Sequence, residues 1–506
     1  MTLFQSAELG HKLTKAQYKR LEPKLRADLL DAQYDLSKHG RFPVIILISG
    51  VRGAGKGETV NLLNAWMDPR HIHTHAFDNP SDEERERPPM WRFWRALPPR
   101  GRVGILFGSW YTAPIIERVF KRSGKMDLLR SITEIRQLER MLADEGALIL
   151  KFWFHLSKDR QKKRLKSLEK NKETRWRVTQ RDWDFFKYYD RFLKVSEEAL
   201  RETSTAHAPW IVVEGSDAEY RAATVGRTIL EALRKRLAAE KAKAGAKKTM
   251  AAAAGTAPPL QRPVDNVHVL KRMDLGLKIS REDYKAHLEK YQRRLALATR
   301  HPKFRDHNVV CVFEGMDAAG KGGAIRRLTA ALDARLYHTI PVAAPTDEER
   351  AQPYLWRFWR HVPRKGKVTF YDRSWYGRVL VERIENFCAE EDWLRAYGEI
   401  NDFEEQLARN GTIVVKYWLQ IGKDEQLRRF KEREKTRFKR FKITAEDWRN
   451  RDKWDLYQTA AADMIDRTST ALAPWTLVEA NDKLHARAKV LETLVKAIET
   501  ALGSRG

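Results

Sequence analysis

A glycine-rich segment with one aspartate and one lysine is the part of the sequence best suited to bind phosphate. Residues 315–323 read GMDAAGKGG and follow a short apolar run. Glycines allow successive backbone N–H groups to curve around an anion, and the helix that follows directs its positive end toward it. Lys321 adds a point charge for the bridging phosphates. The segment therefore predicts a phosphate-binding loop, with contacts from Gly315, Ala318, Ala319, Gly320, Gly322 and Gly323.

Two aspartates near this loop are candidate metal ligands. The Ser or Thr that commonly follows the loop lysine and holds Mg²⁺ is replaced by Gly322, so a metal needs other oxygen donors. Asp317 lies inside the loop, and Asp372 ends a later apolar run. A carboxylate at the C-terminal end of a neighbouring parallel strand suits this role. Asp317 and Asp372 are therefore predicted to hold Mg²⁺, with Mn²⁺ as the alternative ion.

The sequence contains the same pattern twice, 265 residues apart. The segment WRFWR occurs at 91–95 and again at 356–360, and the same offset places Lys56 on Lys321. Self-similarity at a fixed spacing is typical of a repeated structural unit. We therefore expect an internal duplication that produces two similar domains.

The two copies differ at the positions that a metal requires. Residues 50–58 of the first copy read GVRGAGKGE and keep the glycines and the lysine. Arg52 takes the position of Asp317, and Phe107 takes that of Asp372. Catalysis is therefore predicted for the second copy, and the first is predicted to be structural or to bind a polyanion.

Short β-branched apolar runs alternate with segments of helical periodicity. In the second copy the runs lie at 309–313, 368–371, 413–419 and 476–478. Ser280 and Asp283 have the spacing of a capping box and predict a helix to about Thr299. The alternation predicts the α/β class, as two tandem P-loop kinase-like α/β/α sandwich domains with mostly parallel sheets.

Amino-acid composition predicts the segment that links the two domains. The stretch 238–263 is rich in Ala, Lys, Gly and Pro and has little apolar surface to bury. We expect it to be a flexible linker between a first domain at 1–237 and a second at 264–506.

Charge and cysteine content limit the compartment and the partners. The 506 residues include 96 Lys and Arg against 68 Asp and Glu, a net charge of +28, which indicates a polyanionic partner. No apolar run approaches the ~20 residues of a membrane span, so no membrane partner is expected. Cys311 and Cys388 are too few for a disulfide framework, which indicates a cytoplasmic protein.

A strongly basic run follows the third of the apolar runs in the second copy. Residues 422–442 contain ten Lys or Arg and four acids, with Phe438 and Phe441 between the cations. This is the position of a lid in phosphate-transferring kinases. Arg437 and Arg440 are predicted to fold over a transferring phosphoryl group.

Together these motifs resemble the second polyphosphate kinase family. The resemblance rests on 315–323, 347–383 and 435–448, and it covers nearly all of 264–501. It implies Mg²⁺-dependent transfer of a phosphoryl group from inorganic polyphosphate to AMP, forming ADP, by a two-domain class of that family. The family's functional residues map to Asp317, Lys321, Asp372 and Arg373, which we expect to be the catalytic set, and to the basic region 437–442. We also expect phosphate or nucleotide contacts from Arg378, Arg383, Arg433, Lys435, Arg437 and Arg440.

Three other functions remain open from the sequence. The same chemistry with ADP or GDP as the acceptor would form a triphosphate. A nucleotide-driven kinase of a small metabolite would use the same loop. A basic nucleic-acid-binding protein would explain the charge but not the acids beside the loop, so no specific nucleic-acid partner is expected. The oligomeric state also stays open, a homo-oligomer included.

Overall fold

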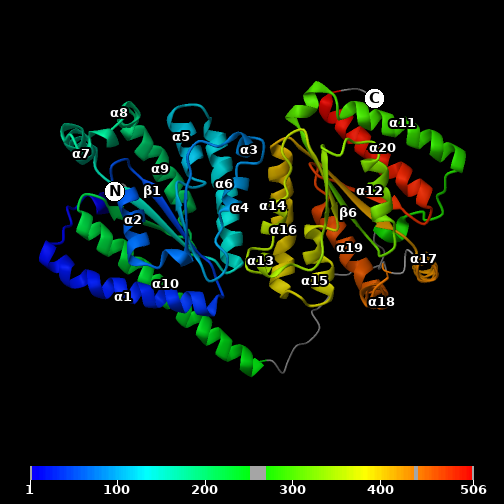
Figure 1. The fold of residues 1–506 in the computed structure, drawn as a ribbon, viewed down its shortest axis with the longest axis horizontal. Coiled ribbons are helices and arrows are strands. Elements are labelled where there is room, and N and C mark those ends of the chain that lie inside the picture. The colour runs from blue at the N-terminus through cyan, green and yellow to red at the C-terminus, as the bar shows by residue number, and fades with distance from the viewer. Residues whose placement is uncertain (1–2, 251–268, 438–440, 442, 504–506) are drawn as a thin grey trace. The chain divides into compact units, whose positions relative to one another are not determined.

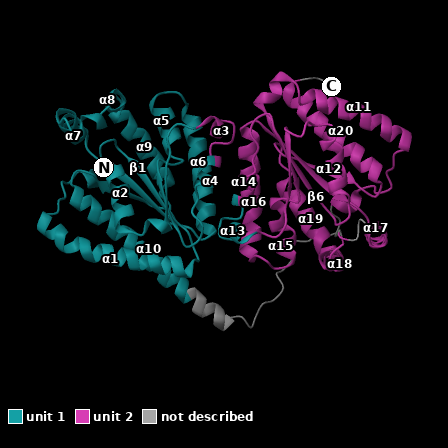
Figure 2. Ribbon diagram, in the orientation of Figure 1, with its two compact units in different colours: residues 1–80, 92–254, 346–356 teal, residues 81–91, 255–345, 357–506 magenta. Residues whose placement is uncertain are grey.

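Each copy of the repeat forms a five-stranded parallel sheet with helices on both faces (Figure 1). The computed structural model describes residues 3–250, 269–437, 441 and 443–503. Their main part divides into two compact units, one around each sheet (Figure 2).

The sheet of unit 1 has the strand order β2-β3-β1-β4-β5. The strands are β1 (Val44–Gly50), β2 (Ile72–Ala76), β3 (Val103–Phe107), β4 (Leu148–His155) and β5 (Trp210–Glu214). One helical layer contains α1 (Lys15–His39), α2 (Lys56–Trp66) and α10 (Ala218–Met250), and the other contains α5 (Thr112–Val119), α6 (Lys125–Asp144) and α9 (Tyr189–Thr203). Short elements complete the unit: α4 (Trp91–Arg95), α7 (Lys158–Lys170), α8 (Gln180–Lys187), and the 3-10 turns η1 (Gln5–Ala7), η2 (Pro69–His71) and η3 (Arg175–Arg177).

The sheet of unit 2 has the equivalent order, β7-β8-β6-β9-β10. The strands are β6 (Asn308–Gly315), β7 (Tyr337–Pro341), β8 (Val368–Asp372), β9 (Thr412–Gln420) and β10 (Trp475–Glu479). One layer contains α11 (Arg281–Ala298), α12 (Lys321–Thr329) and α20 (Lys483–Leu502), and the other contains α15 (Val381–Ile384), α16 (Glu390–Arg409) and α19 (Trp454–Thr468). The remaining elements are α14 (Trp356–Trp359), α17 (Lys423–Lys435), α18 (Ala445–Asp452), and the turns η4 (Val269–Arg272), η5 (Pro302–Asp306) and η6 (Trp375–Val379).

The expected α/β fold and its main elements are confirmed. All pairings within both sheets are parallel. Helix α11 begins where the capping pattern predicts it, with the backbone N–H of Asp283 donating to Ser280 Oγ at 3.0 Å. Strand β7 was not among the predicted runs, because it lies at the sheet edge and its exposed His338 and Thr339 leave too short an apolar pattern.

The two units exchange short segments of sequence. Unit 2 includes Ser81–Trp91, with helix α3 (Asp82–Arg85), and unit 1 includes Thr346–Trp356, with helix α13 (Asp347–Arg350). Within unit 2, Arg87 Nε donates to the carbonyl oxygen of Val362 at 2.9 Å. Within unit 1, the equivalent Gln352 Nε2 donates to the carbonyl oxygen of Leu97 at 3.2 Å. Each unit is therefore completed by a segment from the opposite half of the sequence.

The expected linker begins with helical residues. Helix α10 continues to Met250, so the first part of 238–263 belongs to this helix, and residues 251–263 lie outside the described ranges. In the described part of the chain, no helix is long and apolar enough to cross a membrane.

A buried ion pair fixes the turn that follows strand β8. Lys416 Nζ of β9 lies 2.7 Å from Glu404 Oε2 of α16, and both side chains are at most 2% exposed. Tyr376 OH donates to Glu404 Oε1 at 2.6 Å, and Trp375 Nε1 donates to the same oxygen at 3.0 Å. Lys416 also donates to the carbonyl oxygen of Thr468, at the end of α19, at 2.7 Å. The pair thus joins a strand, two helices and the turn η6.

The same cluster occurs in unit 1. Lys151 and Glu139 form a buried pair at 2.6 Å, and Tyr111 and Trp110 donate to Glu139. Because the cluster is present in both copies, including the copy that lacks the acids, its role is to hold the fold.

We expect Glu404→Gln to lower the free energy of unfolding by about 3–5 kcal/mol, because it leaves the Lys416 ammonium buried without its counter-charge. Glu405→Gln is the matched control, since Glu405 lies next to it on α16 in an exposed pair with Arg409 and should cost less than about 1 kcal/mol. Urea denaturation of both variants measures the difference. Equal losses for the two variants would refute a structural role of the buried pair.

Candidate functional site

The loop between β6 and α12 has the backbone shape of a phosphate cradle. Gly315 ends β6 with φ 140°, and Gly320 precedes α12 with φ 112°. A Cβ atom on Gly315 would lie 2.4 Å from the carbonyl oxygen of Leu419, so β9 leaves no space for a side chain there. Lys321 Nζ folds back over the loop and donates to the carbonyl oxygens of Gly315 at 2.8 Å and Met316 at 3.4 Å. The predicted lysine and glycines therefore meet in one loop.

Asp317 is held by side chains from two other elements. Its Oδ1 accepts a hydrogen bond from Arg373 at 3.0 Å, and its Oδ2 accepts one from Asn450 Nδ2 of α18 at 2.8 Å. Tyr457 OH donates to Asn450 Oδ1 at 3.0 Å. Arg373 has φ 65°, a left-handed conformation that is rare for residues other than glycine. Hydrogen bonds to both of its oxygens thus fix the orientation of the Asp317 carboxylate.

Asp372 faces the beginning of α12. Its Oδ2 lies 3.7 Å from the position that a Cβ atom on Gly322 would take. The glycine that replaces the usual Ser or Thr therefore leaves open space beside this carboxylate. Within the described ranges, no group of three or more His, Cys, Asp or Glu side chains is arranged to hold a metal ion. A metal at Asp317 and Asp372 would need further oxygens from a substrate or water.

Glu314 is a buried acid of this site that the motif did not predict. It is the next-to-last residue of β6 and is 5% exposed, and Ser374 Oγ donates to its Oε1 at 2.8 Å. Burial raises the pKa of Glu314, and the nearby Lys321 and Arg373 oppose this shift. Its equivalent in the first copy is Ser49, so Glu314 differs between the copies as Asp317 and Asp372 do. This difference between the copies is the sequence signal by which Glu314 could have been found.

A pocket opens beside the loop on the side of Asp317 and Arg373. Gln426 Nε2 of α17 donates to the backbone carbonyl of Asp317 at 3.0 Å, which connects α17 to the pocket. The residues that line it are Glu314, Gly315, Met316, Asp317, Arg373, Gly377, Leu380, Val381, Trp418, Gln426, Glu446, Asn450 and Tyr457. The pocket thus combines an apolar wall with carboxylate, guanidinium and amide groups, which is the usual chemistry of a small-ligand site.

The basic run after β9 divides into an anchoring and an exposed part. Arg429, 2% exposed, donates through its two terminal nitrogens to four backbone carbonyls, those of Ala318, Ala319, Ala480 and Asn481, at 2.6 to 3.1 Å. It therefore ties α17 to the phosphate loop. Arg433 is half-buried on α17, Lys435 and Arg437 are exposed, and Arg440 lies outside the described residues.

Two predicted phosphate ligands are engaged elsewhere. Arg378 pairs with Glu382 at 2.8 Å, and Arg383 pairs with Asp463 at 2.8 Å and lies over the ring of Trp393. Neither is among the described residues that line the pocket. Their part in phosphate binding stays a prediction.

The equivalent loop of unit 1 keeps the backbone shape but not the acids. Lys56 Nζ donates to the carbonyl oxygens of Gly50 and Val51 at 2.6 and 2.8 Å. Arg52 pairs with Asp182 at 2.6 Å and lies over the ring of Phe185. Phe185 is the residue of the first copy that corresponds to Asn450. Burial and the charge of Arg52 lower the pKa of Lys56 from 10.5 to about 7, and Asp182 opposes this.

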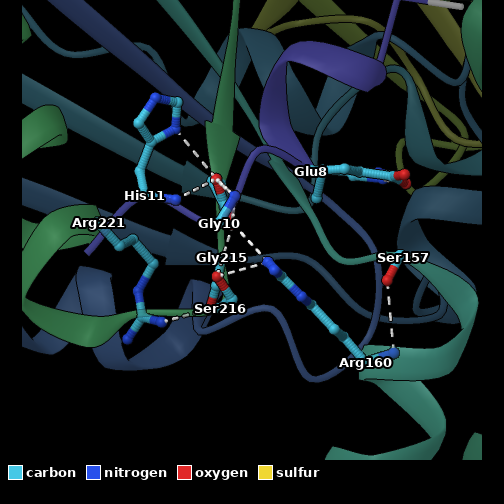
Figure 3. Close-up of polar contacts among 10 residues, drawn as sticks. Glu8, Gly10, His11, Ser157, Arg160, Gly215, Ser216 and Arg221 are labelled. Carbon is cyan, nitrogen blue, oxygen red and sulfur yellow. Dashed lines mark hydrogen bonds and ion pairs between the residues drawn. The ribbon is translucent and has the colours of Figure 1, made fainter.

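The first residues of the chain cover the carboxyl end of β5 in unit 1. The backbone N–H groups of Gly10 and His11 donate to Glu214, and Arg160 pairs with the same carboxylate (Figure 3). Arg221 donates to the carbonyl oxygen of Gly215 at 3.0 Å. The carboxyl end of β5 is therefore covered by the unit's own groups.

Comparison with known proteins identifies the family. A model of the family described as Polyphosphate kinase 2 (PPK2) matches residues 12–241 and 278–505. The chain belongs to the polyphosphate kinase 2 family. Each copy of the repeat is thus one family domain, and the predicted resemblance and the P-loop kinase-like fold are confirmed.

Relatives of this polyphosphate kinase 2 chain match it over its whole length. A polyphosphate:AMP phosphotransferase of Pseudomonas aeruginosa is 58% identical over 99% of both chains. One of Acinetobacter johnsonii is 39% identical over 94% of this chain and 96% of its own. A crystal structure described as a polyphosphate kinase 2 from Pseudomonas aeruginosa has a TM-score of 0.87 at 55% identity and covers 99% of both chains.

Lys56 provides a pH test for the unit 1 loop. Between about pH 7 and 9.5, the unfolded chain keeps a proton on Lys56 that the folded chain has released, so the wild type gains stability as the pH rises. Lys56→Met has no such group, and its melting temperature relative to the wild type should fall across this range. Thermal melts at several pH values measure the trend, with the exposed Lys19→Met as the control. A relative melting temperature that is constant with pH would contradict the lowered pKa.

Proposed function

We propose that this protein transfers a phosphoryl group from inorganic polyphosphate to AMP and forms ADP, and that unit 2 performs the reaction. The observation that carries the proposal is the set of three acids, Glu314, Asp317 and Asp372, around a phosphate loop with its lysine, next to an open pocket. Unit 1 has Ser49, Arg52 and Phe107 at these positions. Relatives that match the whole chain and are named polyphosphate:AMP phosphotransferases support the choice of donor and acceptor.

The residues around the loop fit a hard divalent cation, for which we propose Mg²⁺, with Mn²⁺ as the alternative. Asp317 and Asp372 offer carboxylate oxygens, and Gly322 leaves space beside Asp372. Mg²⁺ is commonly held by one or two carboxylates together with substrate phosphates and water. When bound, the ion neutralises charge on the phosphate oxygens.

The protein groups bind and orient the phosphates. The loop N–H groups and Lys321 hold the donor chain, and Arg373 directs a guanidinium toward the pocket beside Asp317. An oxygen of the AMP phosphate attacks the terminal phosphorus of the chain, and the bond from that phosphorus to its bridging oxygen breaks. The shortened chain leaves with the electron pair. The acceptor oxygen is already ionised, so the step needs no general base, and positioning with electrostatic stabilisation supplies the catalysis.

The exposed cations Lys435 and Arg437 extend the site toward solvent. We propose that they, together with Arg433 and Arg440, attract the polyphosphate chain as the lid of unit 2. We also propose a cytoplasmic location, because Cys311 and Cys388 are both free thiols and such thiols suit a reducing compartment.

The reaction is tested by incubating the purified protein with Mg²⁺, polyphosphate and either AMP, ADP or GDP, and by separating the nucleotides. ADP should form from AMP faster than triphosphate forms from ADP or GDP. Removal of the divalent ion with EDTA should stop the reaction, and added Mg²⁺ should restore it. Triphosphate as the dominant initial product would assign the protein to the diphosphate-accepting alternative, and a strict need for ATP in place of polyphosphate would assign it to a metabolite kinase.

The location of the reaction is tested by paired variants. Asp317→Asn or Asp372→Asn should lower kcat by about a hundredfold or more, because each removes a charge near the transferring phosphoryl group. Lys321→Ala should be comparably damaging, whereas Lys56→Ala, the same change in unit 1, should lower kcat by less than about tenfold. Melting curves establish that each variant is folded. A folded Lys56→Ala protein without activity, beside an active Asp317→Asn protein, would move the active site to unit 1.

A further inference from the structure

The exposed face of helix α7 in unit 1 and the segment that follows it, to the start of η3, carry a row of cations that we call the basic stripe. The stripe consists of Lys162, Lys163, Lys166, Lys170, Lys172 and Arg175, all of them exposed. None of the six forms an ion pair with a carboxylate in the part of the chain that the structure describes. Gln161 and Leu165 are the buried residues of α7 and lie on its opposite face.

Helix α17, the equivalent element of unit 2, is far better balanced. It contains six Lys or Arg and four acids, whereas α7 contains seven and two. The acids of α17 pair with its own cations, as in Arg428 with Glu425 at 2.7 Å and Arg429 with Glu425. The unit that lacks the catalytic acids therefore has the more basic helix.

Such a row is unfavourable for the helix itself. Lys162, Lys166 and Lys170 follow one another at intervals of four residues, a spacing at which like charges repel and destabilise a helix. A ligand with several negative charges would relieve this repulsion. Because these lysines destabilise the helix, their presence indicates that they bind an external anion and do not support the fold.

The phosphate loop of unit 1 is not an open alternative for that anion. Glu58, in the first turn of α2, pairs with Arg221 at 2.7 Å and with Arg164 at 3.0 Å. The guanidinium carbon of Arg221 lies 2.1 Å from the position that a Cβ on Gly55 would take, whereas the equivalent Gly320 has open space. The unit's own side chains thus occupy the loop, whereas the six cations of the basic stripe are exposed to solvent.

We propose that the basic stripe is a docking site for long polyphosphate chains, separate from the catalytic loop. The proposal rests on polyphosphate being the donor. Lys162 to Lys170 span about 12 Å along the helix axis, so a flexible chain with about one charge per phosphate can contact several lysines at once. Because the docked chain stays tethered to the protein, its local concentration at unit 2 rises without any new contact there. Short chains that cannot reach both places gain nothing.

Trp176 provides a test between polyphosphate and nucleic acid as the partner. It follows the stripe on η3, is 72% exposed, and has Arg177 beside its ring at 5.3 Å. A single-stranded nucleic acid would stack bases on such a side chain. Polyphosphate has no bases, so the stripe alone should bind it.

The test compares two triple variants that remove the same charge. The stripe variant is Lys162→Gln, Lys166→Gln and Lys170→Gln, and the control is Lys15→Gln, Lys19→Gln and Lys24→Gln on the exposed face of α1. Calorimetry without AMP measures the binding of long-chain polyphosphate and of tripolyphosphate. The stripe variant should bind the long chain about tenfold more weakly and the control within about twofold of the wild type, with the difference shrinking at high salt. Tripolyphosphate binding should be unchanged in both.

Kinetics and a third variant complete the test. In the stripe variant, the KM for long-chain polyphosphate should rise by the same factor, while kcat and the KM for AMP stay constant. Trp176→Ala should leave polyphosphate binding intact. Equal weakening of polyphosphate binding in both triple variants would show that net charge alone causes the effect. Single-stranded RNA that binds more tightly than polyphosphate, through Trp176, would show that the stripe is a nucleic-acid site. Either result overturns the proposal. Stripe-dependent binding of polyphosphate by a wild type that forms no ADP would keep the docking site and reject the proposed reaction.

Discussion

A lysine and a glutamate buried together are the constraint on which both units depend. Burial raises the pKa of Glu404 and lowers that of Lys416, and the opposite charge of the partner counteracts each of these shifts. The carboxylate also accepts hydrogen bonds from Tyr376 and Trp375, which are separated from Asp372 and Arg373 by Ser374 alone. The buried pair of Glu404 and Lys416 therefore helps to fix the turn that carries the proposed catalytic residues Asp372 and Arg373. The same cluster in unit 1 shows that the scaffold is independent of the chemistry it positions.

The loss of acids in unit 1 is accommodated by neighbouring changes rather than left as a defect. Where unit 2 has Asp317 bound by Asn450, unit 1 has Arg52 lying over Phe185 and paired with Asp182. The ring of Phe185 takes the position of the amide donor Asn450, and Asp182, whose equivalent Asp447 is also present in unit 2, supplies the counter-charge for Arg52. The loop residue thus has the opposite charge in unit 1, one neighbouring side chain differs with it, and the glycines of the loop are the same in both copies.

Sequence reasoning succeeded where the signal is local. The glycine spacing predicted the loop around Lys321, and β-branched runs predicted four strands of unit 2, because both depend on consecutive residues. It missed β7, whose polar edge positions resemble a loop. It also missed Asn450, which reaches Asp317 across 133 positions of sequence through the packing of α18. Contacts of this kind arise from tertiary structure, and a single sequence gives no direct sign of them.

The exchange of Ser81–Trp91 and Thr346–Trp356 limits how this protein could change over evolutionary time. A duplicated domain that lacks the acids of its partner copy could ordinarily be removed, and a shorter gene could replace the duplicated one. Here, deletion of the first half would also remove helix α3 and the hydrogen bond from Arg87 to Val362 that belong to the second unit. The first half of the sequence is therefore part of the architecture of the second unit.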